Sequence, residues 1–167
     1  MLTPHGWLEV READGERDCR LVAAVLRQCY PQEAWTALDV ERFAATPGNG
    51  VKALALGDDG YAVGALLYRQ TETTAEIARV AVTPKLRRCR AAAYAVRAMT
   101  GPASPVRRSV YEARVHEMNE AGIALALKCG FAPAGVAREH YRDGRDAYVF
   151  RLAKESPVRR PAHALVA

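Results

Sequence analysis

The amino-acid sequence predicts a mixed α/β fold with an antiparallel front half and helix crossovers in the back half. In the front half, apolar and polar residues alternate in an opening strand, and three further strand patterns later follow one another across short turns. In the back half, strand patterns alternate with helical ones. The predicted element order is β-α-α-β-β-β-α-β-α-β-β.

A strand and two helices open the chain. Residues 7–12 alternate apolar and polar side chains, and residues 17–30 repeat apolar side chains three and four positions apart, as on one helix face. Thr36 is the predicted N-cap of a second, short helix, with Asp39 as its capping-box partner. We expect that helix to end in the loop formed by residues 46–50.

Turn residues and periodicity define the remaining elements. Strands are expected over residues 51–56, 61–70 and 75–82, with Gly64 at a bulge in the second. Gly130 marks the position just beyond the end of the last helix. After Pro84 the predicted elements are a helix over 90–99, a strand over 108–115, a helix over 119–129, and strands over 131–138 and 146–152.

Length and composition fit one globular domain. The chain has 167 residues, of which 50% are hydrophobic and 26% charged. We expect a single domain over residues 1–153 and a flexible C-terminal tail over 154–167, which is rich in Pro and Arg. No apolar run approaches the roughly 18–20 residues that cross a bilayer, and no signal-peptide pattern opens the chain. A cytoplasmic protein without a membrane partner is therefore expected.

The net charge of +5 is carried mainly by arginine and suits an anionic partner. Nucleic acid, a membrane surface and a phosphate-bearing cofactor all fit that charge. Nucleic acid is not expected, because the basic residues gather at the turn over 85–90 without interleaved aromatic side chains. The four cysteines lie far apart and form no C-x-x-C pair, so no metal site is expected.

Three segments resemble motifs of the GNAT superfamily of N-acetyltransferases. Residues 81–92 read AVTPKLRRCRAA, similar to a cofactor motif in which a strand ending in A-V leads through x-P into R/Q-x-x-G-x-G/A and a helix. Residues 119–131 read NEAGIALALKCGF, similar to the family's N-x-x-A…G-F helix. Residues 138–147 read REHYRDGRDA, similar to the ending of the ribosomal-protein-alanine acetyltransferase branch. The resemblance covers residues 7–153.

The resemblance implies a GNAT fold, a mixed and mostly antiparallel central sheet of six to seven strands flanked by about four helices. It implies an enzyme that uses acetyl-CoA as co-substrate, without a metal, and passes acetyl directly to a primary amine in a ternary complex. The ribosomal branch implies a protein N-terminal α-amine as acceptor, with a small-molecule amine as the alternative. The implied cofactor-binding residues are Val80, Ala81, Val82, Arg87, Arg88, Cys89, Arg90, Ala91, Ala92 and Asn119.

Physical chemistry supports a phosphate site at this motif. A loop that runs into a helix N-terminus presents unpaired backbone N–H groups and the positive end of the helix dipole. Arg87 and Arg88 add cations that can form bidentate contacts with phosphate. The alternative is a solvated basic turn over 85–90.

Three positions depart from the family pattern. Arg90 stands at the first motif glycine, where a left-handed backbone costs a side-chain-bearing residue about 1–2 kcal/mol. A charged hydrogen bond to phosphate contributes about 1.5–3 kcal/mol and could offset that cost. Ala126 replaces a tyrosine that protonates the leaving thiolate in many members, and Arg114 replaces the catalytic glutamate of the ribosomal branch. The alternative function is therefore a catalytically impaired GNAT-like module that binds CoA or a partner.

Glu76 and Tyr141 are the predicted catalytic residues. Residues 75–82 read AEIARVAV, similar to the histone acetyltransferase strand whose glutamate is the general base. Glu76 has the same strand parity as the residues at 80 and 82, which predicts that it faces the same side of the sheet. His116 and His140 are secondary candidates. The alternatives are an exposed strand glutamate and, for the other three, loop or substrate-groove residues.

Overall fold

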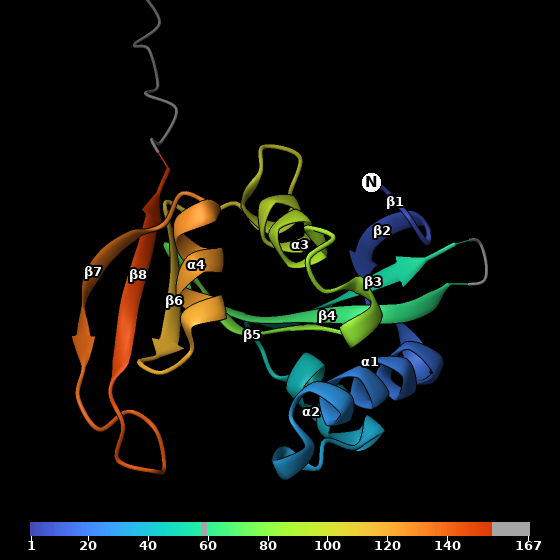
Figure 1. Ribbon diagram of the computed structural model, residues 1–167, viewed down its shortest axis with the longest axis horizontal. Coiled ribbons are helices and arrows are strands. Elements are labelled where there is room, and N and C mark those ends of the chain that lie inside the picture. The colour runs from blue at the N-terminus through green and yellow to red at the C-terminus, as the bar shows by residue number, and fades with distance from the viewer. Residues whose placement is uncertain (58–59, 155–167) are drawn as a thin grey trace, which may run out of the picture.

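One eight-stranded sheet runs through the computed structural model, which describes residues 1–57 and 60–154 (Figure 1). Its strand order is β1-β2-β3-β4-β5-β6-β8-β7. The strands are β1 (Leu2–Thr3), β2 (Gly6–Glu12), β3 (Asn49–Leu56), β4 (Tyr61–Gln70), β5 (Thr74–Val82), β6 (Val110–His116), β7 (Ala132–Ala137) and β8 (Ala147–Ala153). The helices are α1 (Gly15–Cys29), α2 (Ala37–Ala45), α3 (Ala91–Thr100) and α4 (Glu120–Lys128), with 3₁₀ turns η1 (Pro31–Glu33) and η2 (Pro84–Leu86).

The predicted element order and fold class are confirmed, with one addition. The two-residue strand β1 pairs with the start of β2 and is too short to show periodicity in the sequence. The expected tail over 154–167 lies outside the described residues except for Lys154, whose N–H donates to the Ser109 carbonyl. None of the helices in the described ranges is long and apolar enough to cross a membrane.

Local signals place the helix ends as expected. The Thr36 hydroxyl accepts the Asp39 N–H, and the Asp39 carboxylate accepts the Thr36 N–H in return, which completes the capping box of α2. At the end of α4, Gly130 adopts φ +88 and Phe131 donates its N–H to the Ala126 carbonyl at 3.1 Å. This Schellman ending turns the chain back toward the sheet.

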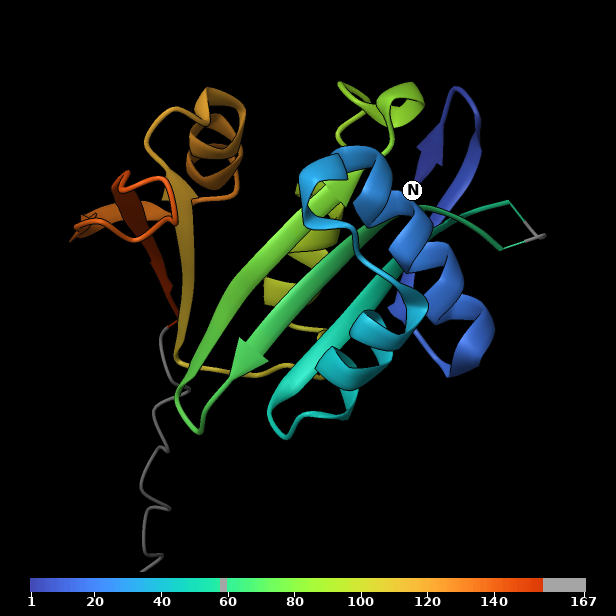
Figure 2. The same ribbon diagram turned by 90° about the horizontal axis from the view of Figure 1, so that it is seen from below.

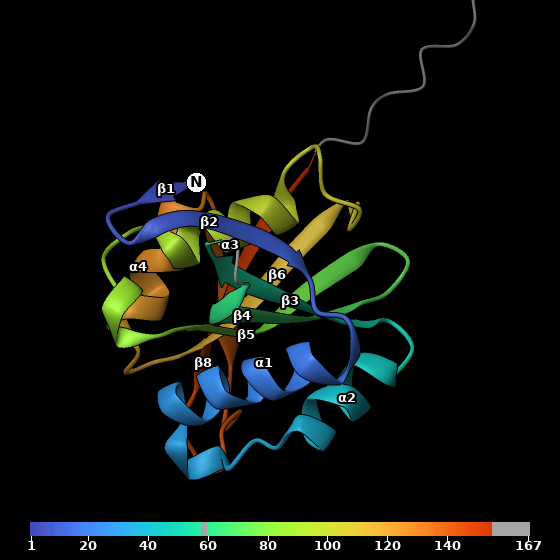
Figure 3. The ribbon, with the colours of Figure 1, turned by 90° about the vertical axis from the view of Figure 1, so that its right-hand side faces the viewer.

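Helices cover both faces of the sheet (Figure 3). On one face α1 and α2 pack against a cluster that includes Val22, Leu26 and Leu67. On the other face α3 and α4 pack against a larger cluster that includes Leu66 and Met99. Because side chains alternate along a strand, adjacent residues of β4 enter opposite clusters and fix the sheet between the two helix layers.

The sheet opens between β5 and β6. These two strands run parallel and pair only from Thr74–Ile77 to Val110–Ala113, after which they separate (Figure 2). The other neighbouring strands pair antiparallel. The far halves of β5 and β6 therefore form the two walls of an opening inside the sheet.

A bulge in β5 reverses the side-chain parity that a regular strand would have. Tyr68 of β4 pairs with Ile77 and the preceding Leu67 pairs with Arg79, so Ala78 is the extra residue. Ile77 and Val80, three positions apart, consequently pack in the same cluster. The prediction that Glu76 shares a face with Val80 and Val82 is therefore wrong, because the inserted residue shifts the alternation by one.

A second bulge lies where Gly64 predicts one. Leu54 pairs with Gly64 and Ala55 pairs with Ala62, which leaves Val63 as the extra residue in β4. A Cβ atom at Gly64 would meet the Ala81 carbonyl oxygen at 2.8 Å. The glycine thus allows β4 to approach the end of β5 closely.

Candidate functional site

Two adjoining cavities lie at the opening between β5 and β6. The larger, which we call the α3 groove, holds about 580 Å³, and the smaller, the splay pocket, holds about 360 Å³. The α3 groove runs over the end of β5, η2, the start of α3 and one side of α4. The two cavities share Tyr30, Val80, Asn119, Gly122 and Leu125, so they are continuous.

The α3 groove is a cationic cavity. The residues that line it in the described chain include Arg87, Arg88, Arg90 and Lys128, and none is acidic. The first turn of α3, starting at Ala91, lies in its wall and presents backbone N–H groups that have no partner within the helix. Arginine side chains and a helix N-terminus together favour an anion such as phosphate.

The loop before α3 has left-handed backbone at two arginines. Arg88 has φ 64 and Arg90 has φ 62, and Arg90 is the N-cap residue of α3. At Arg90 the family motif, which has glycine at this position, predicts this conformation. Nothing in the sequence predicts the left-handed backbone at Arg88. Each position costs about 1–2 kcal/mol relative to glycine. In the described structure no hydrogen bond or ion pair engages either guanidinium, which leaves both to interact with a ligand.

The end of β5 turns its peptide groups toward the opening. The Val80 carbonyl accepts a hydrogen bond from the Tyr30 hydroxyl at 2.9 Å, and the Val82 carbonyl accepts from Cys29 Sγ at 3.4 Å. The Thr83 N–H points the other way and donates to Val63 of β4. Because peptide groups alternate along a strand, the N–H groups of Val80 and Val82 face the opening, where an extended ligand can pair with them.

Nearly all of the predicted cofactor residues meet in the α3 groove. Every one of them except Cys89 lines it. Asn119 has a second role, because its Oδ1 accepts the Gly122 N–H at 2.9 Å and caps α4. A Cβ atom at Gly122 would meet Val115 Cγ1 at 2.8 Å, so this glycine lets α4 lie close against β6.

The splay pocket has a polar mouth and an apolar interior. The polar lining comes from the turn after α1, from β5 and β6, and from the loop before β8: Tyr30, Gln32, Glu33, Arg79, Arg114, His116 and Tyr141, with Asn119 at the junction with the groove. The apolar lining comes from β5, α3, β6, α4 and the residue after it: Ile77, Ala78, Val80, Val96, Ala113, Val115, Leu125, Ala126 and Phe131. A ligand bound here can therefore have one polar and one apolar end.

Glu76 does not line either cavity and is not brought together with Tyr141. Its carboxylate forms an ion pair with Arg114 at 2.7 Å, and Arg114 also contacts Glu112 at 2.6 Å. Arg151 holds the other oxygen of Glu112 at 2.8 Å. Two acids and two arginines thus balance one another, and this accounts for the arginine at 114 as part of a cross-strand charge network.

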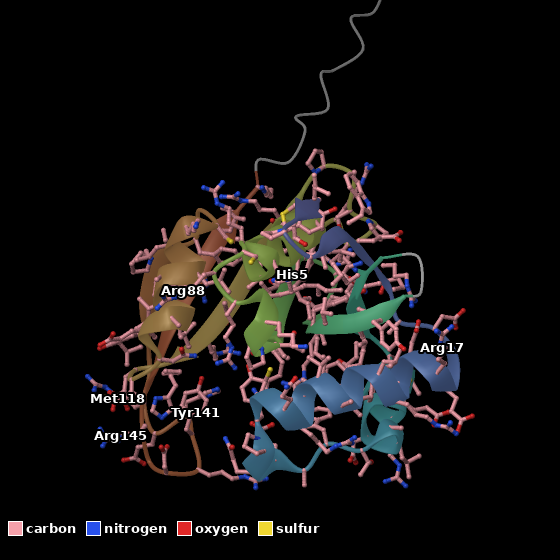
Figure 4. All side chains as sticks on the ribbon, turned by 45° about the vertical axis from the view of Figure 1, so that its right-hand side comes forward. His5, Arg17, Arg88, Met118, Tyr141 and Arg145 are labelled. Carbon is pink, nitrogen blue, oxygen red and sulfur yellow. The ribbon has the colours of Figure 1, made fainter. Side chains whose placement is uncertain are left out.

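Tyr141 lies in the wall of the splay pocket, with its hydroxyl donating to the Arg114 carbonyl at 3.3 Å (Figure 4). Burial raises the pKa of the Tyr141 phenol, so the hydroxyl keeps its proton at neutral pH. The ring packs at a tilt against His116 with centroids 4.7 Å apart, and it meets the His140 ring edge to face at 5.0 Å. Tyr141 is therefore a fixed, neutral phenol in the wall of the pocket.

His116 lines the pocket but has both ring nitrogens engaged. Its Nδ1 accepts the Met118 N–H at 3.1 Å, and its Nε2 lies 3.1 Å from Asp143 Oδ2. In the neutral ring Nε2 must then carry the proton, so no lone pair is left to accept one from a substrate. The hydrogen bond from His116 lowers the pKa of Asp143.

Glu33 is a pocket residue that the sequence reasoning missed. Both of its carboxylate oxygens lie 3.2 Å from Arg79 Nη2, and Oε2 also accepts the Trp35 indole N–H at 2.8 Å. It is the one acid that lines the splay pocket in the described part of the chain. Only Pro31, directly after α1, hints in the sequence at the turn that carries Glu33 toward the sheet. No cluster of metal ligands occurs among the described residues.

A model of the acetyltransferase (GNAT) family matches residues 20–131 of the chain. The matched segment runs from within α1 through the α3 groove to Phe131, three residues after the end of α4. It thus contains the cationic loop, the bulged strand and the whole polar and apolar lining of both cavities apart from Tyr141. A search of proteins of curated function gave no match.

Solved structures share the fold. A probable GNAT-family acetyltransferase from Chromobacterium violaceum superposes with a TM-score of 0.73 at 23% identity, covering 91% of this chain and 86% of that one. The ribosomal-protein-S18-alanine N-acetyltransferase of Escherichia coli gives 0.74 at 16% identity, covering 91% and 98%. Ard1 from Thermoplasma volcanium gives 0.72 at 19% identity, covering 89% and 99%. At these identities the likeness establishes the fold.

Proposed function

The chain belongs to the acetyltransferase (GNAT) family, and from that premise we propose that it transfers acetyl from acetyl-CoA to a primary amine. One observation carries the proposal: a cationic groove at the N-terminus of α3 leads without interruption into a pocket with a polar mouth. The groove suits the phosphates of CoA, and the pocket provides room for an acceptor beside the end of β5. Holding both substrates together is itself a large source of rate.

The residues present fit acetyl-CoA. Arg87, Arg88 and Arg90 would hold the phosphates together with the backbone N–H groups of the first turn of α3. The peptide groups of Val80 and Val82 would pair with the extended arm. The cofactor supplies the activated acyl group, and the protein supplies binding, orientation and electrostatics. The Val80 N–H, which faces the opening, is the donor placed to polarise a carbonyl there.

On the acceptor side, we assign attraction of the ammonium group to Glu33 rather than to Glu76. Each acid is paired with an arginine, Glu33 with Arg79 and Glu76 with Arg114. Only Glu33 lines the pocket, where the Trp35 indole fixes the direction of its carboxylate. Tyr141 is the assigned proton donor to the departing thiolate, since its hydroxyl lies in the pocket wall, where a thiolate would replace the Arg114 carbonyl as its hydrogen-bond acceptor.

We propose a protein N-terminal α-amine as the acceptor to test first. The similarity of residues 138–147 to the ribosomal-protein-alanine branch supports this choice. One structural neighbour also carries such a name, the ribosomal-protein-S18-alanine N-acetyltransferase. The mouth of the splay pocket, between η1 and the Tyr141 loop, is where a peptide end would enter.

A second candidate function is CoA binding without turnover. The specific observation in its favour is that Arg114 replaces a catalytic glutamate of the ribosomal branch and neutralises Glu76, while Ala126 leaves α4 without a proton donor. Tyr141 and Glu33 would then be wall residues of a binding module.

The two candidates are separated by turnover. The protein is incubated with acetyl-CoA and three acceptors: a short peptide with a free N-terminus, the same peptide with a blocked N-terminus and an internal lysine, and a small primary amine. We expect thiol release and a matching mass increase on at least one amine, with the free N-terminus preferred over the blocked peptide. Saturable binding of acetyl-CoA without thiol release from any acceptor would favour the binding module.

A further inference from the structure

The apolar interior of the splay pocket is a feature that acetyl transfer alone does not use. We call it the apolar chamber and define it by Ile77, Val96, Ala113, Val115, Ala126 and Phe131. All six belong to the larger core cluster, yet they leave a cavity where a packed core would be filled. The chamber is therefore a candidate ligand site.

The chamber is not filled by side chains for two reasons. Past Ala113, strand β6 has separated from β5, so no side chain of a paired strand fills the space. On α4 the wall residue is Ala126, whose side chain is small and buried at 6% exposure. The GNAT pattern often has a tyrosine at this position, and an aromatic side chain buries roughly 150–250 Å². Its absence leaves the space open.

The volume of the pocket and the apolar lining of the chamber indicate which kind of ligand would bind there. The pocket measures about 360 Å³, whereas a water-sized group, comparable to the methyl of acetyl, fills roughly 30 Å³. The six side chains of the chamber offer no hydrogen-bond partner, and a buried water needs two to four of them. An extended hydrocarbon group suits this lining better than water or a polar ligand.

The position of the chamber indicates which of the two substrates would supply the hydrocarbon group. Val80 and Leu125, which line the splay pocket beside the chamber, also line the α3 groove, so the apolar lining continues toward the proposed cofactor side. The polar mouth, by contrast, comes from η1 and the Tyr141 loop. An apolar tail carried along β5 past Val80 would reach the chamber without crossing Glu33 or Arg79.

We propose that the apolar chamber holds the hydrocarbon tail of an acyl group longer than acetyl, so that the protein prefers a short- to medium-chain acyl-CoA such as butyryl- or hexanoyl-CoA. This inference rests on the proposed function, because the acyl group reaches the chamber only if CoA binds in the α3 groove. Ala126 is then the residue that sets the acyl length.

The test is calorimetric titration of the full chain with CoA, acetyl-CoA, butyryl-CoA and hexanoyl-CoA. A fully buried methylene strengthens binding about fourfold, so two of them give on the order of tenfold tighter binding for butyryl- than for acetyl-CoA. Ala126→Phe, which fills the chamber without adding a hydroxyl, should remove this gain, so that acetyl-, butyryl- and hexanoyl-CoA bind the variant within about threefold of one another. Leu127→Phe, on the exposed side of α4, is the matched control and should keep the wild-type series. If Ala126→Phe does not fold, Ala126→Leu replaces it.

The outcomes separate this inference from the function on which it rests. Equal or weaker binding of butyryl- and hexanoyl-CoA, with acetyl-CoA still bound, would overturn the chamber proposal and leave the acetyltransferase proposal standing. Failure of every CoA compound to bind would overturn both. If Ala126→Phe instead changes the preference among acceptors with apolar side chains, and not among acyl-CoAs, the chamber belongs to the acceptor and the inference is wrong.

Discussion

Arg90 combines a strained backbone conformation with a side chain that can offset the cost of that strain by contacting a ligand. Its backbone is left-handed at φ 62, the conformation for which the family pattern has glycine. The side chain lies in a groove lined by three further cations. A charged contact with phosphate, about 1.5–3 kcal/mol, would exceed the backbone cost of about 1–2 kcal/mol. A binding loop is expected to have a strained backbone when the ligand is absent and to recover that cost when the ligand binds.

Arg90→Gly should separate these two effects. We expect the variant to stay within about 1 kcal/mol of the wild type in unfolding free energy, because relief of strain offsets the greater chain entropy of glycine. Affinity for acetyl-CoA should fall about tenfold, with a weaker dependence on salt. Denaturant unfolding and calorimetry measure the two quantities, with Arg42→Ala on α2 as a control for loss of charge. Tighter binding by Arg90→Gly would show that the side chain obstructs the groove.

Two carboxylates compete for the acceptor role, and substitution distinguishes them. Glu33→Gln should lower kcat/KM about 10- to 100-fold, mainly through KM, because the neutral amide no longer attracts an ammonium group. Glu76→Gln should leave kcat/KM within about threefold, since Arg114 keeps Glu112 as a partner. The reverse order of effects would return the catalytic role to Glu76.

At the scale of elements, an ion pair joins β2 to α1. The Arg11 guanidinium contacts both oxygens of Asp18, including a 2.8 Å bond to Oδ1, and the Asp14 N–H donates to Oδ2 at 2.9 Å. The hydrogen bond from Arg11 holds the pKa of Asp18 below its ordinary value of 3.8, against the opposing effect of burial. Because Asp18 is buried at 5% exposure, this contact fixes the start of α1 against the sheet.

The lowered pKa predicts an acid-dependent loss of stability. A carboxyl whose pKa is lower in the folded than in the unfolded state stabilises the fold above the unfolded value, near 3.8, and this contribution disappears as pH falls through the folded value. Asp18→Asn should lower the unfolding free energy at pH 7 by about 1–2 kcal/mol, moderated by the partial exposure of Arg11, and flatten the acid limb. Denaturant unfolding between pH 2 and roughly pH 7 measures both effects.

Glu16→Gln is the control, because Glu16 and Arg20 form an exposed pair on the same helix. It should keep both the stability and the acid limb. A retained acid limb in Asp18→Asn would assign that limb to other carboxylates.

Local sequence signals predicted the helices and strands well, but they could not predict the contacts between these elements. Thr36, Asp39 and Gly130 act within a few residues of their partners, so the sequence contains the whole interaction. The bulge at Ala78 depends on how β4 and β5 pair, and no residue near it signals the extra position. That one residue put Glu76 on the other face of the sheet from Val80.

At the scale of the whole molecule, the lining of the α3 groove was predictable from the sequence and the charged lining of the splay pocket was not. The groove residues are contiguous in the sequence, in a strand–loop–helix segment whose chemistry is visible there. Glu33 and Arg79 meet from elements 46 residues apart, and the network of Arg114 with Glu76 joins neighbouring strands. Only the structure shows that Arg114 forms ion pairs between strands of the sheet and that Glu33 lines the splay pocket.

The lining of the groove where the proposed cofactor binds is cationic. The described lining of the α3 groove has four cationic residues and no acid, in a chain whose net charge is +5. The central claim is therefore that this groove holds acetyl-CoA, and calorimetric titration of acetyl-CoA into the wild-type protein tests it most directly. We predict saturable one-site binding with a dissociation constant on the order of micromolar that weakens as salt is raised. No binding by the wild type, or binding that appears only after Arg90→Gly, would contradict the account.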